Sequence, residues 1–119
     1  MQLITNGSEE GHEKGLGWID AKTLKFKKIN NIKVPHMGWN NVIPSNESAL
    51  TKKINSDSRF YFVHSYYVKV KHQKNSILKT FYGYEFDSAI SNKNIYGTQF
   101  HPEKSHKFGM QLFKNFAKI

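Results

Sequence analysis

Residues 97–105 read Gly-Thr-Gln-Phe-His-Pro-Glu-Lys-Ser, and they predict a strand that ends in a histidine followed two residues later by a carboxylate. Proline has no N–H, and its ring favours extended geometry in the residue before it, so His101 is expected to be β-like. Residues two apart in an extended segment point to the same side. We therefore expect His101 and Glu103 to face one pocket, with Phe100 turned the other way into a core.

This pair has the chemistry of a general base and its orienting group. A carboxylate bonded to one ring nitrogen fixes the histidine tautomer, which leaves the second nitrogen free to take a proton from a nucleophile. The alternative interpretation is that His-Pro-Glu is only a turn after an edge strand. The 119 residues contain no cysteine, so they offer no thiol for such a base to activate.

After this stretch, the sequence predicts a C-terminal helix. Ser105 is expected to cap it, with its hydroxyl accepting a backbone N–H of the first turn. Five residues at helical spacing are expected to pack on a sheet as one stripe. They are Gly109, Leu112, Phe113, Phe116 and Ala117.

Before this stretch, alternating apolar residues predict several strands. Residues 59–70 form the clearest one, with both faces apolar, and should be largely buried. Pro35 and Gly38 mark a loop. The other expected strands cover short pieces of 15–32, then 77–82, 83–90 after a bend, and 95–100; short helical pieces are expected at 1–5 and 48–54.

The chain is strongly basic, with 18 Lys and Arg against 9 Asp and Glu and a net charge of +9. Such a balance can indicate a nucleic-acid binder. However, Arg59 is the only arginine, and the forked donor geometry that reads bases or clamps phosphate belongs to arginine. Scattered, solvated lysines explain the charge better, so no nucleic-acid partner is expected.

Other classes of protein are not favoured by the composition. The six histidines lack a His-Glu-x-x-His pattern or paired spacing, so neither a metal site nor another cofactor is expected. The apolar runs are too short to span a bilayer, and the start does not read as a signal peptide. With no cysteine for disulfides, we expect a cytoplasmic protein that does not bind membranes.

Four blocks, in order along the chain, together resemble the class I, triad-type glutamine amidotransferases. Within that family they are most similar to the glutaminase subunit of imidazole glycerol phosphate synthase or a close paralogue. The blocks are Met-Gln-Leu at 1–3 with Ser-Glu-Glu-Gly at 8–11 and Gly-Leu-Gly at 15–17, Val-Pro-His-Met-Gly-Trp-Asn at 34–40, Arg-Phe-Tyr-Phe-Val-His-Ser-Tyr at 59–66, and residues 97–105 with Gly109 following.

The resemblance implies an α/β fold of the flavodoxin-like, three-layer type, with a mixed sheet and a C-terminal helix. In the family, the nucleophilic cysteine lies in a Gly-x-Cys-x-Gly-Met-Gln-Leu elbow, three residues before the methionine that matches Met1. We therefore expect residues 1–119 to be a single incomplete domain, its C-terminal part, with an exposed sheet edge and no activity alone.

The resemblance also assigns roles to residues. His101 would be the general base and Glu103 its orienting group. Glutamine-binding roles fall on Gln2, Glu10, Ser65 and Tyr66, although Ser65 and Tyr66 can also be explained by cross-strand packing alone.

A second group of residues would face a synthase (cyclase) subunit in a heterodimer. This group is His36, Met37, Trp39 and Lys104. The alternatives are that Trp39 is a buried core residue and that Lys104 is an ordinary solvated lysine.

The implied function is hydrolysis of glutamine to glutamate and ammonia, the ammonia being channelled to the synthase subunit in histidine biosynthesis. Two alternatives stay open. One is a glutaminase subunit that serves amination or amidination of surface sugars. The other is a catalytically dead remnant or partner-binding module.

Overall fold

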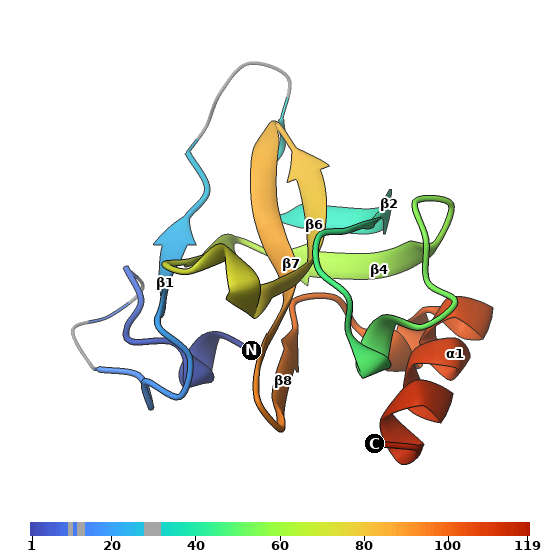
Figure 1. The fold of residues 1–119 in the computed structure, drawn as a ribbon. Helices are drawn as coiled ribbons and strands as arrows, with labels where there is room; N and C mark the ends of the chain where they lie inside the picture. Colours follow the sequence, from blue (N-terminus) through green and yellow to red (C-terminus); the bar gives the residue numbers. More distant parts are fainter. Residues whose placement is uncertain (10, 12–13, 28–31) are drawn as a thin grey trace.

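The computed structural model describes residues 1–9, 11, 14–27 and 32–119. It combines β-sheets with one C-terminal α-helix, so the expected α/β fold is confirmed (Figure 1). The strands are β1 Ala21–Lys25, β2 His36–Asn41, β3 Ile43–Pro44, β4 Arg59–His64, β5 Tyr66–Val70, β6 Ser76–Tyr82, β7 Tyr84–Asn92 and β8 Ile95–Thr98. The helical elements are the 3-10 turns η1 Gln2–Ile4, η2 Ala49–Thr51, η3 Gln73–Asn75 and η4 Pro102–Lys104, and the α-helix α1 His106–Ala117.

The larger sheet has six strands in the order β1-β5-β7-β6-β3, with β8 paired to β7. A separate two-stranded sheet joins β2 to β4. All these strand pairs are antiparallel. The tight turn between β6 and β7 lies at Gly83, whose φ of 77° favours glycine. The strands expected at 77–82, 83–90 and 95–100 correspond to β6, β7 and β8.

A buried ion pair supports the junction between β5 and β7, which pair through Val68 and Asp87 alone. The Asp87 carboxylate is fully buried and accepts the Val70 backbone N–H at 2.8 Å. Lys79 Nζ lies 2.6 Å from the same carboxylate. The lysine and the amide compensate for the loss of water around the carboxylate, which would otherwise be costly to bury.

The single strand expected over residues 59–70 is divided in the structure. It bends at Ser65, so that β4 pairs with β2 and β5 pairs with β1 in the other sheet. The loop expected around Pro35 and Gly38 is also wrong, because β2 begins at His36 and runs through Gly38. Pairing with β4 decides the conformation there, and the local turn residues do not.

Aromatic rings form the centre of the main core. Phe60 stacks on Phe100 with 4.0 Å between ring centroids, and Phe62 meets Phe86 edge-on at 6.0 Å. Phe100 is 2% exposed, which confirms that it turns into the core at the end of the β8 segment.

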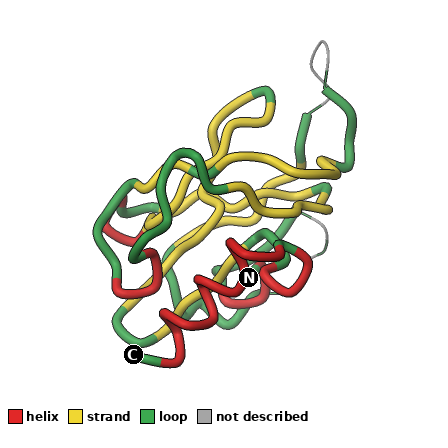
Figure 2. The backbone as a smooth tube through the Cα atoms, turned by 90° about the vertical axis from the view of Figure 1, so that its right-hand side faces the viewer, coloured by secondary structure: helices red, strands yellow, loops and turns green. Residues whose placement is uncertain are grey.

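The inward face of α1 differs from the expected stripe. Gly109 and Leu112 are buried, but Phe113 and Phe116 are about half exposed, and Ala117 is exposed too. Helix α1 lies along one side of the strands (Figure 2). Its rotation is set by Asn115, whose side-chain amide donates to the carbonyls of Leu50 and Lys52 at 2.8 Å. A buried amide that must keep its hydrogen bonds outweighs part of the apolar stripe.

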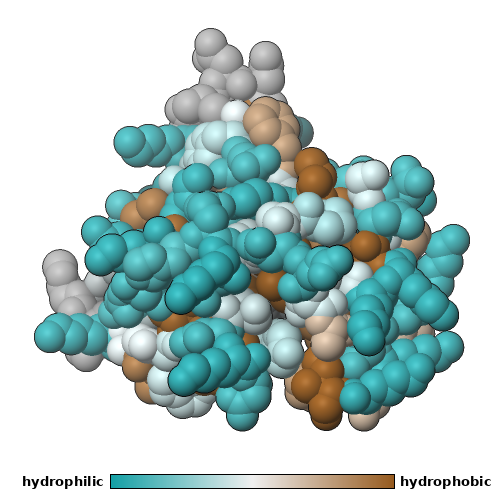
Figure 3. Space-filling model, in the orientation of Figure 1, coloured by the Kyte–Doolittle hydropathy of each residue, from teal (hydrophilic) through white to brown (hydrophobic). Residues whose placement is uncertain are grey.

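The surface is mostly hydrophilic on the face drawn in Figure 3, with scattered apolar patches. The large exposed apolar side chains among the described residues include Met37, Trp39, Phe81, Phe113 and Phe116. No helix in the described part of the chain is long and apolar enough to cross a membrane.

Candidate active site

The site is built where β8 leads into η4 and α1. The backbone N–H of His101 donates to the Tyr61 carbonyl at 2.9 Å, in an isolated antiparallel bridge to β4. His101 itself has extended geometry, with φ −100° and ψ 97°. The histidine is therefore held by β4 as well as by its own segment.

His101 and Glu103 meet directly. Nδ1 of His101 lies 2.8 Å from Oε1 of Glu103, and their side chains are 37% and 57% exposed. The backbone between them is not the extended segment that was expected, because residues 102–104 form the 3-10 turn η4. Proline at the first position of that turn has no N–H to lose, so a turn begins there without cost. The short turn brings the carboxylate back to the ring.

The carboxylate is set to accept from the ring. A hydrogen bond from its own backbone amide lowers the pKa of Glu103, and the hydrogen bond from His101 lowers it further. An ionised Glu103 only accepts, so Nδ1 of a neutral His101 carries the proton that it donates. The lone pair is then on Nε2 and can take a proton from a nucleophile.

Ser105 joins the η4 turn to β4 by hydrogen bonds and does not cap α1, although a cap was expected. Its buried hydroxyl donates to the His101 carbonyl at 2.6 Å and accepts the Tyr61 N–H at 3.0 Å. Both hydrogen-bonding directions of the hydroxyl are used in that way, and no side-chain cap bond forms. Sequence reasoning missed this role, because Tyr61 lies 44 positions away in the chain.

The expected glutamine-binding residues are spread over three segments. Gln2 lies in η1, which packs on β8: a Cβ added at Gly97 would lie 3.0 Å from Cδ1 of Ile4, the last residue of η1 (Figure 1). Ser65 and Tyr66 form the bend between β4 and β5, and both are partly buried. Glu10 lies outside the described residues. The roles of all four residues remain predictions.

A pair of buried histidines lies beside this bend. Nδ1 of His36 is 2.9 Å from Nε2 of His64, and Nδ1 of His64 is 2.7 Å from the Tyr66 carbonyl. His36 is 3% exposed, so the structure does not place it on a partner-facing surface. Sequence spacing gave no sign of this pair, because antiparallel pairing of β2 with β4 sets His36 opposite His64.

Burial keeps both rings neutral. Loss of water lowers the pKa of His36 to about 3, with repulsion from His64 adding to the effect. Burial likewise lowers the pKa of His64 to about 4, although the bond to the Tyr66 carbonyl opposes the shift and His101 adds repulsion.

These pKa values predict that the fold loses stability in mild acid. An unfolded histidine takes up a proton below about pH 6.5, whereas the folded pair does not until about pH 4. Stability is thus fully present above pH 6.5 and falls towards pH 4. Urea unfolding at pH 5 should give a free energy lower than at pH 7.5 by about 2 kcal/mol for each histidine.

The matched variant for this experiment is His36→Phe, which removes one of the two buried imidazoles and keeps an aromatic ring. It should reduce the pH dependence of the unfolding free energy by about one proton. Equal free energies of unfolding at both pH values would contradict the neutral pair.

The other expected partner-facing residues share one surface. Met37 and Trp39 are 62% and 45% exposed on β2, and Trp39 meets Tyr61 edge-on at 6.2 Å. Lys104 Nζ lies 5.9 Å from the Tyr61 ring centroid. Trp39 is therefore not a core residue. A cavity of about 470 Å³ adjoins this surface, lined by Trp39, Arg59, His106, Lys107 and Phe108.

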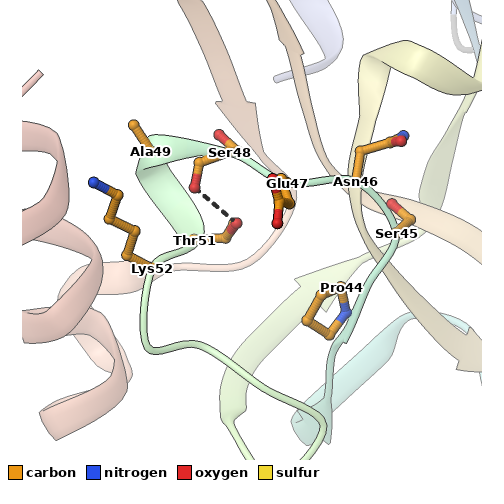
Figure 4. A pocket seen from close by; sticks show the side chains of 8 residues that line it. All are labelled: Pro44, Ser45, Asn46, Glu47, Ser48, Ala49, Thr51 and Lys52. Atoms are coloured by element: carbon orange, nitrogen blue, oxygen red, sulfur yellow. Dashed lines mark hydrogen bonds between the residues drawn. The ribbon is translucent and has the colours of Figure 1, made fainter.

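Another cavity, of about 720 Å³, lies elsewhere. Residues between 44 and 52 line it, and Figure 4 shows the hydrogen bond that the Thr51 hydroxyl donates to the Ser48 carbonyl. None of His101, Glu103 or the buried histidines lines it. Its lining, among the described residues, includes Glu47 and hydroxyl side chains but no histidine. We therefore assign the chemistry to the His101 site, where a carboxylate contacts an imidazole. No group of three or more acidic or histidine side chains in the described part could hold a metal ion.

Comparison with known proteins connects this geometry to a family. Residues 1–119 match the family described as "Glutamine amidotransferase class-I". The chain is 59% identical over 118 residues to "Imidazole glycerol phosphate synthase subunit HisH 2" of Methanococcus maripaludis, a match that covers 99% of the chain and 58% of that relative. It is 52% identical to the protein of that name from Pseudomonas aeruginosa, with the same coverage. It is 47% identical to "Imidazole glycerol phosphate synthase subunit HisH" of Bdellovibrio bacteriovorus, covering 100% of the chain and 60% of the relative. The chain thus spans about three fifths of the length of these curated relatives.

Proposed function

The chain belongs to the class I glutamine amidotransferase family, and on this premise we propose that it carries the base and part of the substrate site of a glutaminase. That glutaminase hydrolyses glutamine to glutamate and ammonia. The ammonia passes to the synthase (cyclase) subunit of imidazole glycerol phosphate synthase, in the cytoplasm, for histidine biosynthesis. The names of the similar proteins favour this acceptor over a surface sugar.

The observation that carries the proposal is the contact of 2.8 Å between His101 Nδ1 and Glu103 Oε1. Together with the partly exposed ring, it supports a base whose tautomer is fixed and whose Nε2 is free. In the proposed reaction, Nε2 takes the proton of a cysteine thiol supplied from outside these 119 residues. The thiolate attacks the side-chain amide carbon of glutamine. The proton on Nε2 passes to the leaving nitrogen, and ammonia leaves as the thioester forms. Water then hydrolyses the thioester to glutamate.

In the proposed mechanism the remaining residues bind glutamine or contact the synthase subunit. The bend at Ser65 and Tyr66, with Gln2 and Glu10, holds the amino-acid end of glutamine. Met37, Trp39 and Lys104 face the synthase subunit, which receives ammonia before it is protonated by bulk water.

The test is a chimera in which this chain replaces the matching region of the Methanococcus maripaludis relative. We expect the 119-residue chain alone to release no glutamate, because it has no thiol. The chimera, mixed with the synthase subunit, should release glutamate from glutamine in a coupled dehydrogenase assay. A folded chimera that binds the synthase subunit but hydrolyses no glutamine would instead favour a partner-binding module.

A further inference from the structure

We propose that His36 and His64 form a relay that positions the Ser65–Tyr66 bend for glutamine and links it to the exposed face of β2. This inference rests on the proposed function, because it assigns a positioning role at the same substrate site. Neither histidine touches the reacting atoms in this proposal. They act by holding the backbone of the Ser65–Tyr66 bend in position.

Every hydrogen bond along the relay has a fixed direction. The Tyr66 carbonyl can only accept, so His64 Nδ1 carries a proton and donates at 2.7 Å. Nε2 of the neutral His64 is then an acceptor, so the proton in the contact of 2.9 Å belongs to His36 Nδ1. Both rings are therefore Nδ1–H tautomers.

Asn40 completes the relay at the β2 end. Its Nδ2 donates to the Phe81 carbonyl at 2.9 Å, and its Oδ1 accepts the Asn41 N–H at 2.8 Å, so the orientation of the amide is fixed. The same Nδ2 lies 3.3 Å from His36 Nε2, which is the acceptor of that ring. The directional sequence is Asn40 to His36 to His64 to the Tyr66 carbonyl.

Aromatic rings surround the relay and exclude water. The His36 ring stacks on Tyr82 with 3.9 Å between centroids and on Phe62 with 4.8 Å. The His64 ring lies 5.2 Å from both Phe26 and Phe86. In such surroundings a hydrogen-bond donor or acceptor without a partner costs free energy. Loss of one hydrogen bond of the relay should therefore weaken the neighbouring one.

The relay ends where substrate is expected. The bend at Ser65 is where the chain leaves the two-stranded sheet for the six-stranded one. Two carbonyls hold it: that of Ser65 accepts the Phe26 N–H at 3.1 Å, and that of Tyr66 accepts from His64. At the other end, Met37 and Trp39 point outward from the strand that carries His36. A partner that shifts β2 would thus move the bend.

The first measurement is ¹⁵N NMR of the 119-residue chain, labelled at histidine, at pH 7. We expect His36 and His64 to be neutral Nδ1–H tautomers, the minority form of free histidine, with a coupling across the bond between His36 Nδ1 and His64 Nε2. A merely space-filling pair would not require this tautomer. A proton on Nε2 of either ring, or a charged ring, would overturn the relay.

The second measurement compares two variants by amide hydrogen exchange. In His36→Asn, the side-chain amide can still donate from the Nδ1 position, whereas His36→Leu donates nothing. We expect exchange of the Phe26 amide to be about tenfold faster in His36→Leu than in His36→Asn. The Gln99 amide, bonded to the Ser88 carbonyl at 2.9 Å, should exchange equally in both variants and so reports on global stability. Equal Phe26 exchange in the two variants would count against the relay.

These results are independent of catalysis. If the relay is found as described but the chimera with its synthase subunit is inactive, the proposed function fails and the hydrogen-bonded relay remains. If the chimera is active and the tautomers differ, the relay alone fails.

Discussion

The His101→Ala variant of the active chimera is expected to lose glutamine hydrolysis by roughly a millionfold in kcat. Without the imidazole, the carboxylate left beside it is a poor base for the thiol, because a hydrogen bond from its own backbone amide lowers the pKa of Glu103. The measurement is single-turnover release of glutamate with the synthase subunit present, so that partner binding does not limit the rate.

Two matched variants make this result specific. Glu103→Gln should lower kcat on the order of 10⁴-fold or less, since an amide can still contact the ring but no longer selects the Nδ1–H tautomer. His72→Ala removes an exposed histidine that lies beside Asp20, away from the site, and should keep kcat within a few-fold. Glutaminase activity that survives His101→Ala would contradict the assignment of His101 as the base.

Replacement of Gly109 by alanine is expected to destabilise the chain by about 3 kcal/mol. A Cβ at Gly109 would lie 1.8 Å from the Pro102 carbonyl oxygen, so α1 and η4 cannot keep their present distance. Alanine is otherwise favoured over glycine inside a helix by about 1 kcal/mol, so the sign of the effect is diagnostic. The free energy of unfolding in urea at pH 7.5 measures it.

Gly11→Ala is the control for the lower conformational entropy of the unfolded chain, because an added Cβ at Gly11 meets nothing within 4 Å. Met110→Ala is the control for a substitution on the exposed face of α1, because Met110 is 58% exposed. Both should stay within about 0.5 kcal/mol of the parent chain. A Gly109→Ala variant as stable as the parent would mean that α1 does not approach the η4 turn so closely.

The sequence predicted the contact between His101 and Glu103 better than the backbone that makes it. His101 and Glu103 are separated by one proline, so few conformations keep them apart, and they meet although the segment is a turn and not extended. The strand-to-helix order around them was also predicted correctly, because hydrophobic periodicity is local. Residues far apart in the chain were beyond such reasoning.

Two departures from expectation have the same origin. Residues 59–70 read as one strand, yet Ser65 divides them because their two halves pair with different partners. The stripe on α1 includes Phe113 and Phe116, yet the two bonds of Asn115 to the segment after Ser48 turn those rings outward. Periodicity shows that a face is apolar, but not which neighbour will cover it.

By itself the sequence determined the family, the contact of His101 with Glu103, and the burial of Phe100, because these depend on neighbouring residues and on motifs in a fixed order. The tertiary structure alone decided the hydrogen bond between Ser105 and Tyr61 and the hydrogen bond between His36 and His64. Those contacts join positions 44 and 28 residues apart. Their geometry is set by strand register and by the need to satisfy buried polar groups, which no local pattern encodes.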